Sequence, residues 1–270
     1  MNLVAPRILF LIAIISVGGF VSAANPTLSA HLLSVKKIWD RAPHNAFTDL
    51  IRFKSRWYCV FREGDGHAKG EGKLRVLVSK DGEAWESAAL IEEKGRDLRD
   101  AKFAITPDRR LMLNGGSADP ADHSPKGSFY SVVSFSKDGR AWGPLRGSSY
   151  QPKALLMQSS APYTGWAKKE LTADVGGDQI GGPAILRVPD GGLIGAGRRF
   201  SDKPSKEQRT GLFLIDAGKA TLTNLLMFPS GGDTSYPGLV WYNNQLWISY
   251  YSSHEEKSSI YLAKIELKRR

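Results

Sequence analysis

Apolar and polar residues alternate along most of this chain, in short runs that end at turn-forming residues. The runs Leu74–Val78 and Tyr130–Phe135 show the period of two that is typical of half-buried β-strands. Strongly apolar runs, such as Trp57–Arg62 and Leu246–Tyr251, each follow a more polar segment and a turn signal. The pattern therefore predicts an all-β protein built from repeated strand–turn–strand units.

One turn sequence occurs twice, and each copy directly follows an alternating run. The heptapeptide Ser79–Trp85 returns as Ser136–Trp142, and the two copies differ only where Glu83 is replaced by Arg140. In such a turn, aspartate accepts hydrogen bonds from backbone N–H groups, glycine supplies a positive φ, and tryptophan covers the turn. Two copies in the same setting predict a repeated unit of the kind that forms the blades of a propeller.

Four units share one layout, in which a polar inner segment leads through a turn to an apolar strand. Their inner segments are Ala46–Ile51, Leu98–Phe103, Gly182–Leu186 and Thr234–Val240. The markers Asp49, Asp100, Pro183 and Tyr236 in these segments are separated by 51, 83 and 53 residues. Two of the spacings fit one blade of about 50 residues, and the middle one fits neither one blade nor two. We expect a further strand, His31–Trp39, to join the last blade and close the ring.

The pattern Ser-x-Asp-Gly-x-x-Trp resembles the Asp box of the BNR-repeat proteins, which are sialidase-like β-propellers. Longer stretches resemble secreted six-bladed members of this family, often described as exo-α-sialidases: His44–Leu50, Cys59–Gly64, Asp97–Lys102, Gly231–Gly238 and Tyr250–Glu255. The resemblance implies a six-bladed-type sialidase-like propeller, truncated to about four to five blades, with the Asp boxes as structural turns away from the active site.

Members of this family have more sequence between the second Asp box and Ile180, so the resemblance implies that about one and a half blades are missing near residues 143–180. Leu155–Met157 and Ala161–Trp166 resemble the outer strands of a blade whose inner strands are absent. Such a loss leaves a ring that is open or rearranged, because exposed strand edges are costly.

Residues 1–23 have the features of a signal peptide. Arg7 supplies a positive charge, the run Ile8–Val17 is apolar but short for a membrane span, and Val21–Ala23 is a small-residue cleavage site. We therefore expect a propeller domain over residues 24–270 that is secreted or periplasmic, without a membrane anchor after cleavage. The single cysteine, Cys59, lies in an apolar strand, and we expect it to be a small buried residue.

The chain is basic, with a formal net charge of +10 and a pI of about 9.6. This balance favours an acidic partner, such as an anionic sugar, a polyanion or a membrane surface, although general surface basicity explains it as well. The charges are scattered and no RNA-binding aromatic signature is present, so a nucleic-acid partner is not predicted. The oligomeric state stays open.

Sialidases of this family bind the carboxylate of the sugar with three arginines, because a guanidinium offers two parallel hydrogen bonds. The resemblance makes Arg62, Arg198 and Arg99 the substrate-binding candidates, with His254 beside them. Glu63 and Gly64 replace the Ile-Pro that follows the first arginine in the family, and the resemblance places the remaining arginine in the missing strands. An ordinary surface or aspartate-paired role stays open for each arginine.

The family uses a tyrosine nucleophile, a carboxylate that raises its nucleophilicity, and an aspartate acid/base. By resemblance, Tyr236 is the nucleophile candidate, Asp49 and Asp100 are the acid/base candidates, and Glu63 and Glu255 are the candidates for the partner carboxylate. Channel lining by the tyrosine and turn capping by the aspartates are the alternatives. We expect Asp49, Asp100 and Tyr236 to meet at one mouth of the ring.

His44, His67 and His254 lie near these stretches, but no ligand-type spacing links them, so neither a metal site nor a cofactor is predicted. The predicted function is exo-α-sialidase-type hydrolysis of terminal acidic sugars, with impaired activity as one outcome. The alternative is a non-catalytic propeller that binds carbohydrate or protein.

Overall fold

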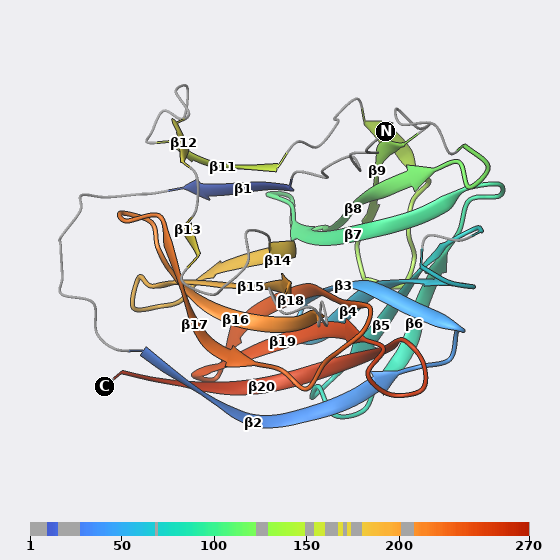
Figure 1. The fold of residues 1–270 in the computed structure, drawn as a ribbon. Helices are drawn as coiled ribbons and strands as arrows, with labels where there is room; N and C mark the ends of the chain where they lie inside the picture. Colours follow the sequence, from blue (N-terminus) through green and yellow to red (C-terminus); the bar gives the residue numbers. More distant parts are fainter. Residues whose placement is uncertain are drawn as a thin grey trace, which may run out of the picture.

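The computed structural model describes residues 10–15, 28–67, 70–122, 129–148, 154–159, 167–169, 172–173, 180–200 and 208–269. Within these ranges the chain forms β-strands in five sheets and no helix (Figure 1). Accordingly, the part of the chain described here has no helix with the length and apolar character needed to cross a membrane.

Four of the sheets form the blades of a propeller. The first blade consists of β3 (His44–Phe53), β4 (Arg56–Gly64), β5 (Lys73–Ser79) and β6 (Glu86–Ile91). The second consists of β7 (Asp97–Ile105), β8 (Leu111–Ala118), β9 (Tyr130–Ser136) and β10 (Arg146–Ser148). The third consists of β14 (Ile180–Arg187), β15 (Leu193–Phe200), β16 (Gln208–Asp216) and β17 (Thr221–Met227), with the short β13 (Thr172–Ala173) at its edge.

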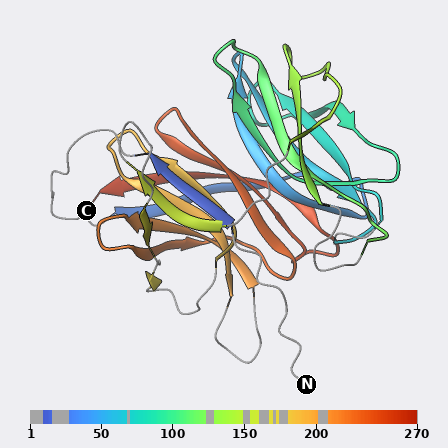
Figure 2. The same ribbon diagram turned by 90° about the horizontal axis from the view of Figure 1, so that it is seen from above.

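The fourth blade confirms the prediction that the N-terminal strand joins the last blade. It consists of β18 (Thr234–Tyr242), β19 (Gln245–Ser252), β20 (Ser259–Arg269) and β2 (Leu28–Trp39), and β2 pairs antiparallel with β20. The strand β3 lies against both β7 and β18, and β18 lies against β14, so the first strand of each blade is innermost (Figure 2). The fold is thus all-β with four blades, as the repeat pattern predicted.

The fifth sheet consists of β1 (Phe10–Ile15), β11 (Ala154–Ser159) and β12 (Ala167–Lys169). Strand β1 pairs parallel with β11 and contacts β14 of the third blade; the sheet lies at the top of Figure 1. Leu155–Met157 therefore pairs with the N-terminal segment and β12, whereas Ala161–Trp166 lies outside the described residues. The removal of residues 1–23 as a signal peptide stays a prediction.

Large apolar side chains fill the spaces between neighbouring blades. Trp57 of the first blade stacks on Trp247 of the fourth, with ring centroids 4.3 Å apart and an interplanar angle of 17°. Val76 and Leu113 belong to the cluster between the first and second blades. Cys59 is fully buried in this core, as predicted, and burial raises the pKa of its thiol, so it is an unreactive packing residue.

Both copies of the repeated turn fold in the same way, and both connect the outer strands of a blade. Asp81 Oδ1 accepts hydrogen bonds from the backbone N–H groups two and three residues later, at 2.8 and 3.2 Å, and Asp138 Oδ1 does the same at 2.8 and 2.9 Å. Gly82 and Gly139 adopt φ values of 82° and 76°. The turn chemistry predicted from the sequence is confirmed.

Each repeated turn also packs against the neighbouring blade. A Cβ at Gly82 would lie 2.3 Å from the ring of Trp247, and a Cβ at Gly139 would lie 2.2 Å from the ring of Tyr58. The Tyr58 hydroxyl in addition donates to the carbonyl of Asp138 at 2.8 Å. Trp247 and Tyr58 occupy the same register position in the second strands of two adjacent blades. The glycines therefore serve both the turn and the contact between blades.

Candidate functional site

The inner strand of every blade contains a bulge at the same register position, where two residues face one on the next strand. The first residue of each bulge has a positive φ: Phe47 (63°), Asp100 (56°), Gly182 (53°) and Tyr236 (47°). This conformation costs non-glycine residues about 1–3 kcal/mol and is concentrated at functional sites. The equivalent positions are therefore Phe47, Asp100, Gly182 and Tyr236, which corrects the markers Asp49 and Pro183.

Tyr236 is packed between the bulges of two other blades. Its ring centroid lies 4.8 Å from that of Phe47 in the first blade. A Cβ at Gly182 in the third blade would lie 2.5 Å from the Tyr236 ring, so only glycine leaves room for the tyrosine there. The contacts place the aromatic ring of Tyr236 between the inner strands of the first and third blades.

The charges of the neighbouring blades act on the Tyr236 hydroxyl. Burial raises its pKa, and the Asp100 carboxylate raises it further, whereas the guanidinium groups of Arg198 and Arg99 lower it. Burial also raises the pKa of Asp100, against the opposing charges of Arg99 and Lys102. Asp100 Oδ1 is buried and has no hydrogen-bond partner among the described residues. A phenol that retains its proton thus lies near a carboxyl whose affinity for protons is increased, which is a combination suited to acid/base chemistry.

Arg62 and Arg198 occupy equivalent register positions in β4 and β15, but their environments differ. The side chain of Arg62 has no exposed surface; its Nε donates to Asp97 Oδ1 at 2.7 Å and its Nη1 donates to the carbonyl of Gly66 at 2.8 Å. Arg198 retains 18% exposure, and its Nη1 lies 3.7 Å from Asp233 Oδ1. Arg62 thus has a structural role as a buried ion-pair partner, and its substrate-binding role stays a prediction; of the two arginines, Arg198 is the more exposed.

Arg99 shares a feature with each of these arginines, because it pairs with Asp97 as Arg62 does and is partly exposed as Arg198 is. Its Nη2 pairs with Asp97 Oδ2 at 3.0 Å, and a quarter of its side chain is exposed. It directly precedes Asp100 in the bulge of the second blade, and its charge acts on Tyr236. Arg99 and Arg198 are thus the two arginines that the structure brings to the tyrosine.

Asp233, which the sequence analysis did not single out, is the acceptor of a polar cluster beside this site. Its Oδ2 lies 2.9 Å from His44 Nε2 and 2.7 Å from His67 Nδ1, and its Oδ1 accepts a hydrogen bond from the Tyr251 hydroxyl at 2.7 Å. Although burial opposes ionisation, these hydrogen bonds hold the pKa of Asp233 well below its usual range. We call Asp233, His44, His67 and Tyr251 the Asp233 cluster.

Two carboxylates expected at the site hold the blades together instead. Asp49 Oδ2 accepts a hydrogen bond from the backbone N–H of Phe103 at 2.7 Å, and its Oδ1 lies 3.7 Å from Lys102 Nζ. Glu63 accepts hydrogen bonds from Trp39 Nε1 at 2.7 Å and from Arg75 at 2.9 Å. Because neighbours in a strand point to opposite faces, Glu63 faces away from Arg62 and toward the closing strand. Both carboxylates thus have structural partners, and the acid/base role of Asp49 and the partner role of Glu63 stay predictions.

Glu255 and His254 also lie apart from Tyr236. Glu255 is nearly half exposed and pairs with Lys37 of β2 at 2.5 Å. The Nδ1 of His254 lies 2.9 Å from Ser252 Oγ, and its ring packs at 5.1 Å from that of Tyr261. These contacts all lie within the fourth blade, and the assignments of the two residues to catalysis and substrate binding stay predictions.

Lys102 is a further residue that the sequence did not reveal. From the second blade, its Nζ donates to the carbonyl of Thr48 in the first blade at 3.1 Å and to that of Pro237 in the fourth at 3.2 Å. The side chain thus links three blades through one ammonium group. It fixes the inner strands that contain Asp100 and Tyr236 relative to each other.

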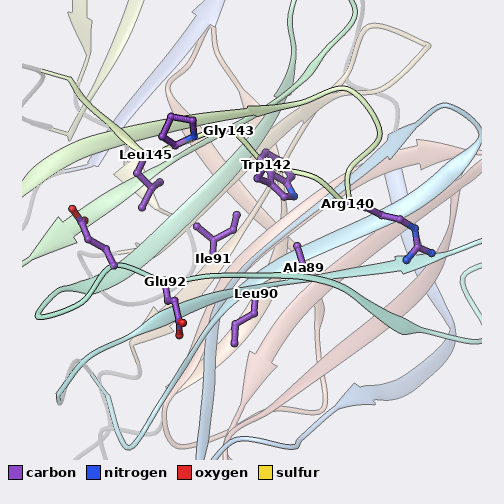
Figure 3. Close-up of a pocket in the computed structure, with 10 residues that line it drawn as sticks. Ala89, Leu90, Ile91, Glu92, Arg140, Trp142, Gly143 and Leu145 are labelled. Atoms are coloured by element: carbon purple, nitrogen blue, oxygen red, sulfur yellow. The ribbon is translucent and has the colours of Figure 1, made fainter.

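A separate groove lies on the outer rim of the propeller, with a volume of about 450 Å³. Figure 3 shows Ala89 and Ile91 of β6 facing Trp142 and Leu145, which follow β9. The groove is formed by the outer strands of two blades and by the second repeated turn. None of the candidate site residues lines it.

No family model and no curated protein matches this sequence. Solved structures do match its fold. A protein of unknown function from Dyadobacter fermentans has a TM-score of 0.57 and 14% identity, with 89% of this chain and 100% of that chain covered. A GH32 β-fructofuranosidase from Bombyx mori has a TM-score of 0.60 and 11% identity, with 88% and 62% covered. A sialidase from Trypanosoma rangeli has a TM-score of 0.52 and 12% identity, with 89% and 60% covered.

The fold is that of a sialidase-like β-propeller. Its structural neighbours include glycosidases of more than one kind, and at these identities the likeness concerns the fold alone. This chain also spans less than two thirds of the length of the two enzymes. The neighbours therefore assign no reaction to this chain.

We predict that Asp100→Asn raises the stability of the fold at neutral pH. The pKa of Asp100 is higher in the folded chain than in the unfolded chain, where an aspartate has a pKa of about 3.9. The carboxyl therefore contributes fully to the stability of the fold below a pH of about 3.9, and this contribution is lost as the pH rises through the folded-state pKa. Asparagine tolerates the left-handed backbone at this position. The melting temperature of the variant should exceed that of the wild type at pH 7, and the difference should shrink toward pH 3. A variant that melts lower at pH 7 would show that the ionised carboxylate stabilises the fold.

Proposed function

We propose that this propeller binds terminal acidic sugars of the sialic acid type at Tyr236 and hydrolyses them weakly. One observation carries the proposal: Tyr236 and Asp100 occupy equivalent strained bulges, and the positive charges of Arg99 and Arg198 act on the same tyrosine. Guanidinium groups suit the capture of a sugar carboxylate. A neutral tyrosine also suits attack on an anionic sugar, which would repel a carboxylate nucleophile.

In the proposed reaction, Arg198 and Arg99 hold the sugar carboxylate, and the Tyr236 oxygen attacks the anomeric carbon. The bond from that carbon to the leaving oxygen breaks, and the tyrosine proton passes through Asp100 to the leaving oxygen, which departs as an alcohol. Water then attacks the anomeric carbon, the bond to Tyr236 breaks, and Asp100 carries one proton of the water to the tyrosine oxygen. Asp100 has to serve both the tyrosine and the leaving group, because Glu63, Glu255 and Asp49 are engaged elsewhere. The raised pKa of Tyr236 slows the attack further.

Other features support the same proposal. The net charge of +10 attracts anionic glycans. The signal-peptide features of residues 1–23 support export to the periplasm or the medium, where such glycans occur, and we include secretion in the proposal. The two repeated turns support membership of the Asp-box proteins, as the sequence resemblance implies.

We predict that Arg198→Ala weakens the binding of N-acetylneuraminic acid by roughly 10- to 150-fold, because a charge-assisted hydrogen bond contributes about 1.5–3 kcal/mol. Titration calorimetry measures this change. The matched control is Arg187→Ala in the same blade, because Arg187 is exposed and donates to the carbonyl of Gly191 at the far end of β14. Equal loss in both variants, or in neither, contradicts the assignment of Arg198.

Tyr236→Phe separates the enzyme from its alternative, a non-catalytic carbohydrate-binding propeller. With a fluorogenic sialoside we expect slow turnover by the wild type and none by the variant, while the affinity for the free sugar stays within about twofold. Wild-type binding of the sugar without any turnover would favour the carbohydrate-binding module. The contacts of Glu63 with Trp39 and of Glu255 with Lys37 also favour it, because they occupy two candidate catalytic carboxylates. Turnover that survives in Tyr236→Phe rules out this tyrosine as the nucleophile.

A further inference from the structure

Three residues of the Asp233 cluster each direct one ligand-type atom to a common point. His44 Nε2, His67 Nδ1 and a carboxylate oxygen of Asp233 all lie within 4.8 Å of one another. They come from the start of β3, from the segment after β4 and from the residue before β18. Two blades of the propeller therefore contribute to one group of donors, next to the bulge that contains Tyr236.

We propose that His44, His67 and Asp233 form a binding site for a divalent transition metal of the Zn²⁺ class. Two imidazoles and one carboxylate suit zinc, cobalt or nickel better than calcium or magnesium, which prefer oxygen ligands alone. Three protein ligands leave a coordination position for water or for a bound ligand. The proposal differs from the sequence analysis, which predicted no metal site at these histidines.

The donor atoms have to rearrange to accept the ion, and the two imidazole nitrogens, which lie within 4.8 Å of each other, have to reach the spacing of a coordination sphere. Ligand distances of about 2.0–2.2 Å place neighbouring atoms about 3.3 Å apart in a tetrahedral site. The nitrogens of His44 and His67 now lie 2.9 and 2.7 Å from Asp233 Oδ2, so each has to move away by roughly half an ångström. The side chain of His67 is 52% exposed, which leaves room for this movement and gives an ion access from solvent.

The surroundings of Asp233 resemble the outer shell of a metal site. The Tyr251 hydroxyl donates to Asp233 Oδ1 and thereby orients the other oxygen toward the two imidazoles. Arg198, 3.7 Å from Oδ1, adds a positive charge that lowers the affinity for a cation and favours an anion at the open position. The ligand class expected there is an oxyanion such as a carboxylate. The metal proposal does not depend on the proposed hydrolysis, because it rests on the donor set.

The test is a titration of the metal-free protein with Zn²⁺ by calorimetry and with Co²⁺ by visible absorption. The protein is freed of its purification tag and stripped with a chelator. We expect one Zn²⁺ per chain and a Co²⁺ spectrum typical of nitrogen and oxygen ligands. His67→Ala and Asp233→Asn should each weaken binding by at least about tenfold, and Tyr251→Phe, which alters only the outer shell, by about tenfold.

His254→Ala is the matched control, because this histidine lies nearby in the sequence of the fourth blade but is bonded to Ser252. Its affinity for Zn²⁺ should equal that of the wild type. His67 is exposed, so its variant should fold, which circular dichroism verifies. Absence of Zn²⁺ binding in the wild type overturns the proposal and leaves a purely hydrogen-bonded cluster. Binding that persists in both His67→Ala and Asp233→Asn overturns it as well, because the ion then lies elsewhere.

Discussion

Replacement of Arg62 by alanine should lower the free energy of unfolding by about 3–5 kcal/mol, although no ligand is involved. Arg62 and Asp97 are both buried, and the 2.7 Å hydrogen bond between them joins the first and second blades. Removal of the guanidinium leaves Asp97 buried with Arg99 as its remaining ionic partner. It also opens a void beside Gly72, whose missing side chain makes room for the pair. Denaturant titration of the variant measures the loss.

An exposed ion pair provides the control for Arg62. Arg110 pairs with Asp108 at the same 2.7 Å, but both side chains are well exposed, so Arg110→Ala should lose less than about 1 kcal/mol. The double variant Arg62→Met/Asp97→Leu removes both buried charges and should recover most of the stability lost in Arg62→Ala. An Arg62→Ala variant that keeps its stability but loses affinity for acidic sugars would restore the ligand-binding role implied by the family resemblance.

Gly238→Ala should be similarly damaging, for a steric reason. A Cβ at Gly238 would lie 2.1 Å from the backbone nitrogen of Leu50 and 2.7 Å from the backbone carbon of Asp49. Backbone atoms cannot rotate away as a side chain can, so β18 and β3 have to separate. We expect a loss at or above the upper end of the range of about 1–3 kcal/mol that is usual for overpacking. Thermal and denaturant unfolding both report it.

Gly147→Ala in the edge strand β10 is the matched control for Gly238. A Cβ there meets only the ring of Tyr130, at 3.8 Å, and the φ of Gly147 is not positive. The control should stay within about 1 kcal/mol of the wild type or gain slightly, because alanine restricts the unfolded chain. If Gly238→Ala were as stable as this control, the first and fourth blades would not approach each other as closely as described.

The blades were predictable because their signals are local. Alternation in Leu74–Val78 and Tyr130–Phe135 identified the third strands of two blades, and the repeated turn that follows each of them fixed the hairpin beyond. The pairing of β2 with the last blade was also predictable, because β20 would otherwise leave an exposed strand edge. Composition and turn chemistry within about ten residues carry all of this information.

The site was less predictable because it depends on register and on distant contacts. The bulge in β3 makes Phe47, and not Asp49, the residue equivalent to Asp100 and Tyr236 in the other blades. The sequence pattern does not indicate this difference of two residues. The Asp233 cluster joins residues 189 and 166 positions apart, so spacing could not reveal it. The opposite directions of Arg62 and Glu63, by contrast, follow from strand alternation and could have been foreseen.

Recognition of an acidic sugar at Tyr236 is tested most directly by comparing N-acetylneuraminic acid with its carboxyl methyl ester in calorimetric titrations of the wild-type protein. The ester lacks the negative charge that the free acid offers to Arg198 and Arg99 and carries one additional methyl group. We expect the free acid to bind and the ester to bind at least about tenfold more weakly, because esterification removes the charge-assisted hydrogen bonds. Equal affinity for acid and ester, or binding of neither, would contradict an acidic-sugar site at the centre of this propeller.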